Sequence, residues 1–144
     1  MNQSTSTGAS IGVKELKHVT LVVKDLERSR QFYCDLLGME LMERPVFDFP
    51  GMWFRVGGME LHLVLHQDGC ADAGYLNETP DTEEGFVHHV AFEVHNTYEA
   101  AEQLKEHGVR MAGGLPGRRP DCAQLWCYDP DGHVVELFGG PRTH

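Results

Sequence analysis

Four side chains that can bind a metal or carry a proton lie in strand-like, otherwise apolar segments: His18, His62, His89 and Glu136. An unpaired imidazole or carboxylate is costly to bury in such a strand, and a divalent cation would remove that cost. Imidazole with carboxylate suits Zn²⁺, Ni²⁺, Mn²⁺ or Fe²⁺. We therefore predict metal binding by His18, His89 and Glu136. His62 is predicted as a fourth ligand, a general base beside the metal, or a hydrogen-bonding contact to substrate.

An internal repeat supports this set, since a single strand histidine is more often structural or at the surface. The segment 17–23 (KHVTLVV) reappears as 88–94 (HHVAFEV), and each copy leads into an amphipathic stretch that stops at a glycine. Each copy then closes with an aromatic strand, a turn and an apolar strand. The repeat pairs His18 with His89 and His62 with Glu136, so that the four side chains could converge around a pseudo-twofold axis.

The elements that would position these residues follow from the hydrophobic pattern. In the first copy we expect a strand over 16–23, a helix over 26–37 that Asp25 caps and Gly38 ends, and two or three strands up to His66. In the second we expect a strand over 86–94, a helix that starts at Asn96, a short strand over 109–113 and a hairpin of 124–128 with 133–138.

Side chains alternate along a strand, so parity predicts which residues share a face. His18 shares a face with Thr20, His62 with Glu60, His89 with Glu93, and Glu136 with Phe138. If a curved sheet encloses a pocket, these faces can be the concave ones. Glu60 and Glu93 are then outer-shell or acid–base candidates, or side chains that face water at a strand end.

The predicted fold class is α+β: two βαβββ modules that form a curved, barrel-like mixed sheet around a metal site. We expect one domain in which 1–12 is a disordered leader, 13–66 and 86–139 are the modules, and 140–144 is a tail. Segment 67–85 between them holds six acidic residues and no Lys or Arg. It is predicted as a solvated linker, with a functional lid as the alternative.

Composition excludes several classes of function. The chain has 144 residues, 41% hydrophobic residues and a formal net charge of -10. This acidity disfavours nucleic acid and anionic membranes as partners. No apolar run approaches the ~20 residues of a membrane helix. The polar start is not a secretory signal, so we expect a cytoplasmic protein with reduced thiols, the alternative being a Cys122–Cys127 disulfide.

Other residues could line a substrate pocket. Arg118 and Arg119 could bind a carboxylate or phosphate, or be solvated loop cations. Four aromatic residues could line an apolar pocket or belong to the core: Phe47, Phe49, Trp53 and Trp126. His88 must point away from its neighbour His89. The remaining histidines are expected at the surface: His66, His95, His107, His133 and His144.

The sequence resembles the vicinal oxygen chelate superfamily, which includes glyoxalase I, extradiol dioxygenases, methylmalonyl-CoA epimerase, fosfomycin-resistance enzymes and bleomycin-resistance proteins. The matching stretches are 16–26 (LKHVTLVVKDL), 32–39 (FYCDLLGM), 88–94 (HHVAFEV) and 128–137 (YDPDGHVVEL). The resemblance implies paired βαβββ modules around a metal that chelates two neighbouring substrate oxygens and stabilises a developing oxyanion.

The resemblance also implies roles for single residues. The family's metal positions fall on His18, His89 and Glu136, and a further position, a glutamate in the glyoxalase I branch, falls on His62. The expected catalytic residues are His62, which could move protons, and Glu136. Thr20 matches the fosfomycin branch and joins Trp53, Arg118, Arg119 and Trp126 as the expected substrate contacts.

The resulting expectation is a divalent-metal-dependent enzyme of lyase or isomerase type that acts on a small oxygen-rich substrate. One alternative is an Fe²⁺ extradiol dioxygenase, since a His-His-Glu set matches its facial triad. Another is a non-catalytic protein that sequesters a drug, as in the bleomycin-resistance branch. By analogy with the superfamily we expect a homodimer, with each site built within one chain or across two.

Overall fold

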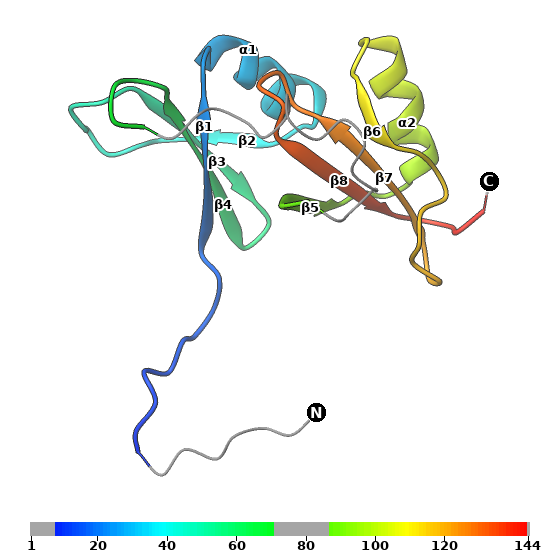
Figure 1. Ribbon diagram of the computed structural model, residues 1–144, viewed down its shortest axis with the longest axis horizontal. Helices are drawn as coiled ribbons and strands as arrows, with labels where there is room; N and C mark the ends of the chain where they lie inside the picture. Colours follow the sequence, from blue (N-terminus) through cyan, green and yellow to red (C-terminus); the bar gives the residue numbers. More distant parts are fainter. Residues whose placement is uncertain (1–7, 71–86, 144) are drawn as a thin grey trace.

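The computed structural model describes residues 8–70 and 87–143, which form two βαβββ modules (Figure 1). The first contains β1 (His18–Val23), α1 (Leu26–Arg30), η1 (Gln31–Leu36), β2 (Glu40–Met42), β3 (Gly51–Val56) and β4 (Met59–Leu65). The second contains β5 (His89–Glu93), α2 (Thr97–Glu106), β6 (Met111–Gly113), β7 (Ala123–Tyr128) and β8 (Val134–Gly139). The protein is an α+β protein, and the predicted element order is confirmed.

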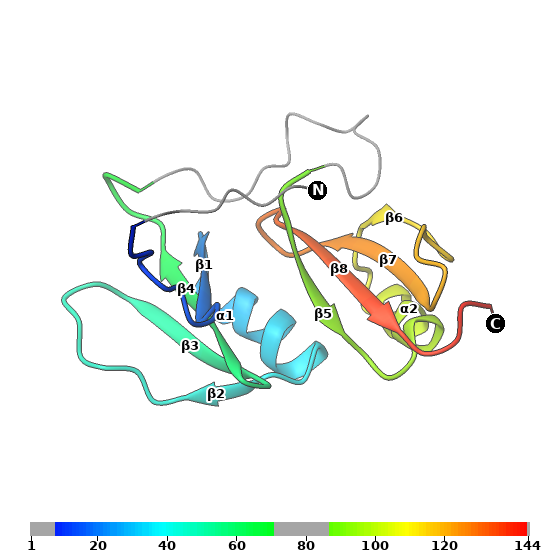
Figure 2. The same cartoon turned by 90° about the horizontal axis from the view of Figure 1, so that it is seen from below.

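Each module has the same sheet topology, as the repeat predicts. The strand orders are β1-β4-β3-β2 and β5-β8-β7-β6. In each sheet the first strand runs parallel to the last, and the other neighbours are antiparallel. Figure 2 shows the two sheets side by side rather than closed into one barrel. As a result β1 and β5 each pair with a single strand and are edge strands among the described residues.

A short polar side chain caps the N-terminus of each helical segment. The Asp25 side chain accepts a 3.0 Å hydrogen bond from the backbone N–H of Arg28, and the Asn96 side chain accepts from the N–H of Tyr98 at 2.9 Å. The first segment continues from α1 into the π-helical turn η1 and ends at Gly38, whose φ of 81° suits glycine. The predicted helix over 26–37 is therefore confirmed as a combination of α and π turns.

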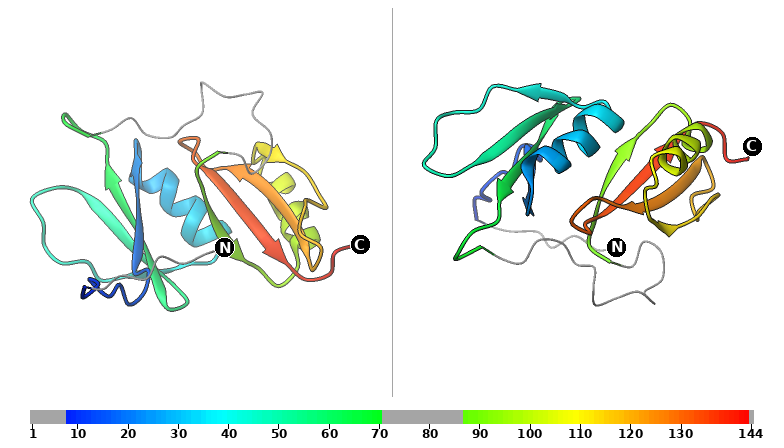
Figure 3. Two further views of the ribbon diagram at one scale, coloured as in Figure 1. Left: turned by 60° about the horizontal axis from the view of Figure 1, so that its bottom comes forward. Right: turned by 90° about the horizontal axis from the view of Figure 1, so that it is seen from above.

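The apolar faces of both sheets pack into one core. Sheet residues such as Phe54, Leu61 and Leu137 are almost completely buried together with Phe32 of η1 and Leu104 of α2. Figure 3 shows α1 and η1 between the two sheets, with α2 on the outer side of the second sheet. The helices therefore cover the core faces, and the opposite face of each sheet is left for the candidate ligands.

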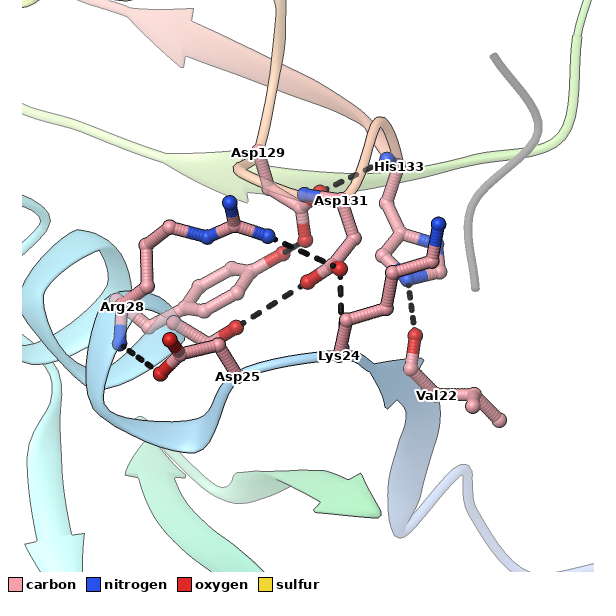
Figure 4. Close-up of polar contacts among 9 residues, drawn as sticks. Val22, Lys24, Asp25, Arg28, Asp129, Asp131 and His133 are labelled. Carbon is pink, nitrogen blue, oxygen red and sulfur yellow. Dashed lines mark hydrogen bonds and ion pairs between the residues drawn. The ribbon is translucent and has the colours of Figure 1, made fainter. Parts of the chain in front are cut away.

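The turn between β7 and β8 joins the two modules (Figure 4). The side chain of Asp131 is fully buried and accepts hydrogen bonds from the backbone N–H of Lys24 at 3.0 Å and from the Ser29 hydroxyl at 3.4 Å. It also forms an ion pair with Arg28 at 3.4 Å. This turn therefore links the second module to the first through hydrogen bonds and an ion pair.

His133 lies in this junction, which corrects the expectation of a surface histidine. Its side chain is 5% exposed, and its Nε2 lies 2.8 Å from the carbonyl oxygen of Val22 (Figure 4). Its position after the Asp-Pro-Asp-Gly turn suggested exposure, but the turn itself packs against the end of β1. His66, His88, His95 and His107 are exposed, and His144 lies outside the described residues.

Several further expectations concern the chain as a whole. All four cysteines are free, so Cys122 and Cys127 do not form a disulfide. Burial raises the pKa of the Cys127 thiol to about 12. No helix in the described part of the chain is long and apolar enough to cross a membrane. Most of the predicted linker or lid, from residue 71 on, and residues 1–7 of the leader lie outside the described residues.

Candidate metal centre

The first group of candidate residues lies on the face of the first sheet that is opposite the core. The strand register places Thr20, His62 and Trp53 in one row across β1, β4 and β3. The side chain of His62 is 10% exposed, and its imidazole lies between two parallel rings. Its centroid is 3.9 Å from that of Trp53 and 4.1 Å from that of His18. His18 and Thr20 are exposed on the same face.

Glu60 orients the imidazole of His62. The Nε2 atom of His62 lies 2.8 Å from Oε1 of Glu60, two residues earlier on the same face. This hydrogen bond from His62 lowers the pKa of the Glu60 carboxyl. Because an ionised carboxylate can only accept, we place the His62 proton on Nε2, which leaves the lone pair on Nδ1. Glu60 thus contacts a candidate ligand, as an outer-shell residue would.

The second group lies on the corresponding face of the second sheet. The register places Ala91, Glu136 and Trp126 in one row across β5, β8 and β7. Glu136 is 7% exposed, and its Oε1 lies 3.1 Å from Nε2 of His89. Since Trp53 pairs with His62 and Trp126 with Glu136, the two rows are equivalent, as the repeat predicts.

The contact between His89 and Glu136 brings two acceptors together. The Nδ1 atom of His89 lies 2.7 Å from the carbonyl oxygen of Val87, which can only accept, so Nδ1 carries the proton. The lone pair of Nε2 then points toward a carboxylate oxygen. Only an additional proton or a metal cation makes this contact favourable. Metal-binding histidines almost always donate their second N–H to a carboxylate, a backbone carbonyl or a water, and Val87 supplies a backbone carbonyl here.

The spacing of these two donors fits a metal ion. Two donors that are each about 2.1 Å from one tetrahedral or octahedral cation lie roughly 3.0–3.4 Å apart. The observed separation of Nε2 of His89 and Oε1 of Glu136 is 3.1 Å. The residues present therefore fit the divalent metal that the sequence predicts.

The two groups remain apart within one chain. In the described ranges 8–70 and 87–143, no three or more His, Cys, Asp or Glu side chains gather closely enough to hold a metal ion. His18 with His62 on one sheet and His89 with Glu136 on the other are therefore two separate groups, which are called the first and second half-sites below. The 720 Å³ groove between α1 and the β7–β8 turn contains none of the four predicted ligands.

The predicted substrate contacts divide between the half-sites. Thr20 and Trp53 adjoin His62, whereas Trp126 adjoins Glu136 and is 2% exposed. The turn 116–121 lies over Trp126, with the Arg118 guanidinium carbon 5.6 Å from its ring centroid. Arg119 lies over the ring of Phe138 at 4.6 Å and forms an ion pair with Asp121 at 2.7 Å.

The remaining aromatic candidates extend the first half-site. Phe47 stacks on Phe49 at 5.0 Å and lies 6.1 Å from Trp53, and the Arg44 guanidinium lies 4.6 Å above Phe47. Phe47 is 42% exposed. Ring contacts therefore run from the loop before β3 to His62 and His18. Glu93 is exposed on the face of His89.

One residue of the second half-site was not identified from the sequence. Gln124 shares the face of Glu136, and its Nε2 donates a 3.0 Å hydrogen bond to Oε2 of Glu136. The sequence did contain one indication of this position: Gln124 lies two residues before Trp126, so alternation along the strand places both side chains on the same face. A polar residue at the start of a strand is usually at the surface, but Gln124 is 7% exposed.

Comparison with known proteins identifies the family. The model of the glyoxalase/bleomycin resistance protein/dioxygenase superfamily matches residues 15–137. The protein therefore belongs to this superfamily, the vicinal oxygen chelate group that the sequence resembles.

Two similar relatives are named as enzymes. The lactoylglutathione lyase of Neisseria meningitidis serogroup A is 32% identical over 140 residues, which cover 85% of this chain and 88% of that protein. The ethylmalonyl-CoA/methylmalonyl-CoA epimerase of Cereibacter sphaeroides is 30% identical over 106 residues, which cover 70% and 76%.

A solved structure has the same fold. A variant of the fosfomycin resistance protein FosX from Listeria monocytogenes matches with a TM-score of 0.67 and 23% identity, over 90% of this chain and 94% of that chain. It was solved as a complex with Mn(II) and 1S,2S-dihydroxypropylphosphonic acid.

Proposed function

We propose that the protein is a divalent-metal-dependent enzyme of lyase or isomerase type that acts on a small substrate with two neighbouring oxygens. The contact of His89 with Glu136 carries this proposal, because a lone pair and a carboxylate oxygen face each other at metal-ligand spacing. The lyase and epimerase names of its relatives support the reaction type. When bound, the metal would act as a Lewis acid that stabilises negative charge developing on the substrate.

We propose that His18, His89 and Glu136 hold the metal and that each site is built from two chains. β1 and β5 are edge strands, and His18 and His89 are their first residues. If β5 of a second copy lies along β1, the second half-site of one chain meets the first half-site of the other. A twofold-symmetric pair of chains then completes two equivalent sites and removes the exposed edges.

We propose that His62 transfers the proton. With its Nε2–H directed to Glu60, its Nδ1 lone pair is available to accept a proton from the substrate. The rings of Trp53 and His18 hold the imidazole in place, and Glu60 stabilises the imidazolium that forms. Thr20 and the two tryptophans border the substrate, and the turn that carries Arg118 and Arg119 receives a negatively charged group.

Metal analysis tests the proposal directly. The purified protein should take up close to one Mn²⁺, Zn²⁺, Ni²⁺ or Fe²⁺ per chain, and His89→Ala should take up much less. Mn²⁺ is the first ion to test, because the similar FosX structure contains it. Wild-type protein that binds none of these ions would contradict the proposal. Turnover of methylglyoxal–thiol adducts should follow metal loading, whereas oxygen uptake with catechols and Fe²⁺ would identify the dioxygenase alternative.

The ring stack supports a second candidate, a non-catalytic protein that sequesters a planar ligand. Phe47 is partly exposed, and its ring contacts lead through Trp53 to His62. Such a surface can bind a flat aromatic molecule without a metal. Tight binding of an aromatic ligand to metal-free protein, with no turnover in the presence of any of the four ions, would favour this candidate.

A further inference from the structure

Gln124 uses both ends of its side-chain amide in the second half-site. Its Oε1 accepts hydrogen bonds from the backbone N–H groups of Arg118 at 2.7 Å and Arg119 at 2.6 Å. Its Nε2 donates to Oε2 of Glu136 at 3.0 Å. Because two donors face Oε1, the orientation of the amide is unambiguous, and its N–H is directed at the carboxylate.

The two oxygens of Glu136 consequently have different partners. Oε2 accepts from Gln124, and Oε1 faces Nε2 of His89. The last torsion of a glutamate side chain is broad, so one anchored oxygen greatly limits where the other can lie. Gln124 also supplies a hydrogen bond to the carboxylate of Glu136, whose side chain is 9% exposed, and this bond offsets part of the cost of burying the carboxylate.

The turn 116–121 is built closely around Gln124. The backbone N–H of Gln124 donates to the Pro116 carbonyl at 2.9 Å. Gly117 has a φ of +79°, and a Cβ at that position would lie 2.6 Å from Cβ of Gln124. A side chain on residue 117 would therefore push directly against Gln124. The side chain of Gln124 therefore holds both the turn that contains Arg118 and Arg119 and the carboxylate of Glu136.

We infer that Gln124 is a positioning residue, which holds the Glu136 carboxylate in the orientation that binds the metal and ties it to the Arg118–Arg119 turn. This inference rests on the proposed function, because Glu136 must be a ligand for its orientation to matter. Outer-shell partners of this kind typically change metal affinity by roughly 10–100-fold when they are removed.

Two variants test this role by different means. Gln124→Met removes the hydrogen bond to Glu136 at nearly constant volume. Gly117→Ala keeps every hydrogen-bonding group and displaces Gln124 sterically. Isothermal titration with Mn²⁺ and with Zn²⁺ should show affinities reduced roughly 10–100-fold for both variants. Circular dichroism of the metal-free proteins establishes whether each variant is folded. If Gln124→Met does not fold, Gly117→Ala still tests the role of Gln124.

Arg142→Gln is the matched control. The Arg142 guanidinium donates to the carbonyl oxygens of Pro116 at 2.8 Å and Gly117 at 3.2 Å, so its loss loosens the same turn without touching the Gln124–Glu136 bond. Its metal affinity should stay within about twofold of wild type, well below the change expected for an outer-shell partner. Wild-type affinity in folded Gln124→Met, or an equal loss in Arg142→Gln, would overturn the inference.

The same titrations separate this inference from the proposed function. If wild-type protein binds neither ion, the proposed metal site fails and the role of Gln124 fails with it. If wild type binds metal and both Gln124→Met and Gly117→Ala bind it equally well, the proposed function stands and only the positioning role is overturned. Amide hydrogen exchange at residues 118 and 119 should accelerate in Gln124→Met and confirm that the two N–H bonds were lost.

Discussion

The hydroxyl of Tyr33 donates a 2.6 Å hydrogen bond to Oδ2 of Asp129 and so joins the helical segment of the first module to the β7–β8 turn of the second. The Tyr33 side chain is fully buried, and Asp129 is 5% exposed. Burial and the neighbouring Asp129 raise the pKa of Tyr33 well above its usual value, and burial raises the pKa of Asp129 as well. This bond therefore connects the two modules that carry the half-sites.

The raised pKa of Tyr33 predicts a loss of stability at alkaline pH. A folded-state pKa above the unfolded value of about 10 gives a stabilisation that is complete below pH 10 and is lost as the pH rises from there through the folded-state pKa. Ionisation of one tyrosine, followed by absorbance at 295 nm, should therefore coincide with the loss of circular dichroism. Tyr33→Phe should lack this step and be about 1–3 kcal/mol less stable to urea at pH 7. Separate ionisation and unfolding transitions in wild type would contradict the prediction.

Replacement of Glu136 by Gln should have opposite effects on metal binding and on the metal-free protein. The amide can donate to Nε2 of His89, which replaces two facing acceptors by a hydrogen bond, while its oxygen accepts from Gln124. The metal-free variant should melt at the temperature of wild type or above it. Its metal affinity should fall at least tenfold, because the charged ligand is lost. A variant that loses stability without losing metal would show that Glu136 is structural only.

Complementation between inactive variants should test whether the site spans two chains. His18→Ala disables the first half-site and His89→Ala the second. If each site is built from two chains, a mixed dimer of these variants contains one site with both half-sites intact. Unfolding and refolding the two proteins together should restore up to about a quarter of wild-type activity and metal content, since half of the dimers are mixed and each has one of two sites. Each variant refolded alone is the control, and no recovery in the mixture would place each site within one chain.

Removal of the Asp131 carboxylate should loosen the module junction. Asp131→Asn weakens the contacts to Lys24, Arg28 and Ser29 and should destabilise the protein by about 1–3 kcal/mol in urea unfolding. Asp121→Asn is the matched control, because its ion pair with Arg119 is exposed and should contribute less than about 1 kcal/mol. Equal stability of the two variants would show that the junction does not depend on Asp131.

The repeat in the sequence predicted most of the fold. The alignment of His18 with His89 paired His62 with Glu136, and the structure has these two residues at equivalent register positions, His62 opposite Trp53 and Glu136 opposite Trp126. The caps at Asp25 and Asn96 were also predictable, because short polar side chains at helix starts have a local cause.

The relation between the modules was not predictable in the same way. It depends on contacts more than 90 residues apart in sequence, such as those of Tyr33 with Asp129 and His133 with Val22. His133 was expected at the surface because the residues around it form a turn, and nothing local indicates that the turn is buried. Gln124 was not predicted for a similar reason. Its position depends on contacts both with Glu136 and with the backbone of Arg118 and Arg119, and these contacts are not evident from the sequence.

The repeat places His62 in the first copy at the position that Glu136 occupies in the second. An imidazole in place of a carboxylate changes the net charge of the proposed metal site. With His18, His89 and Glu136 as ligands of a divalent cation and a neutral His62 beside them, the proposed site retains one positive charge. Glu60 provides a compensating negative charge, because its carboxylate oxygen lies 2.8 Å from Nε2 of His62. A substrate that becomes an anion during the reaction would therefore be stabilised by a site with a net positive charge. The proton that the substrate loses would be accepted by His62, whose protonated ring would be paired with the carboxylate of Glu60.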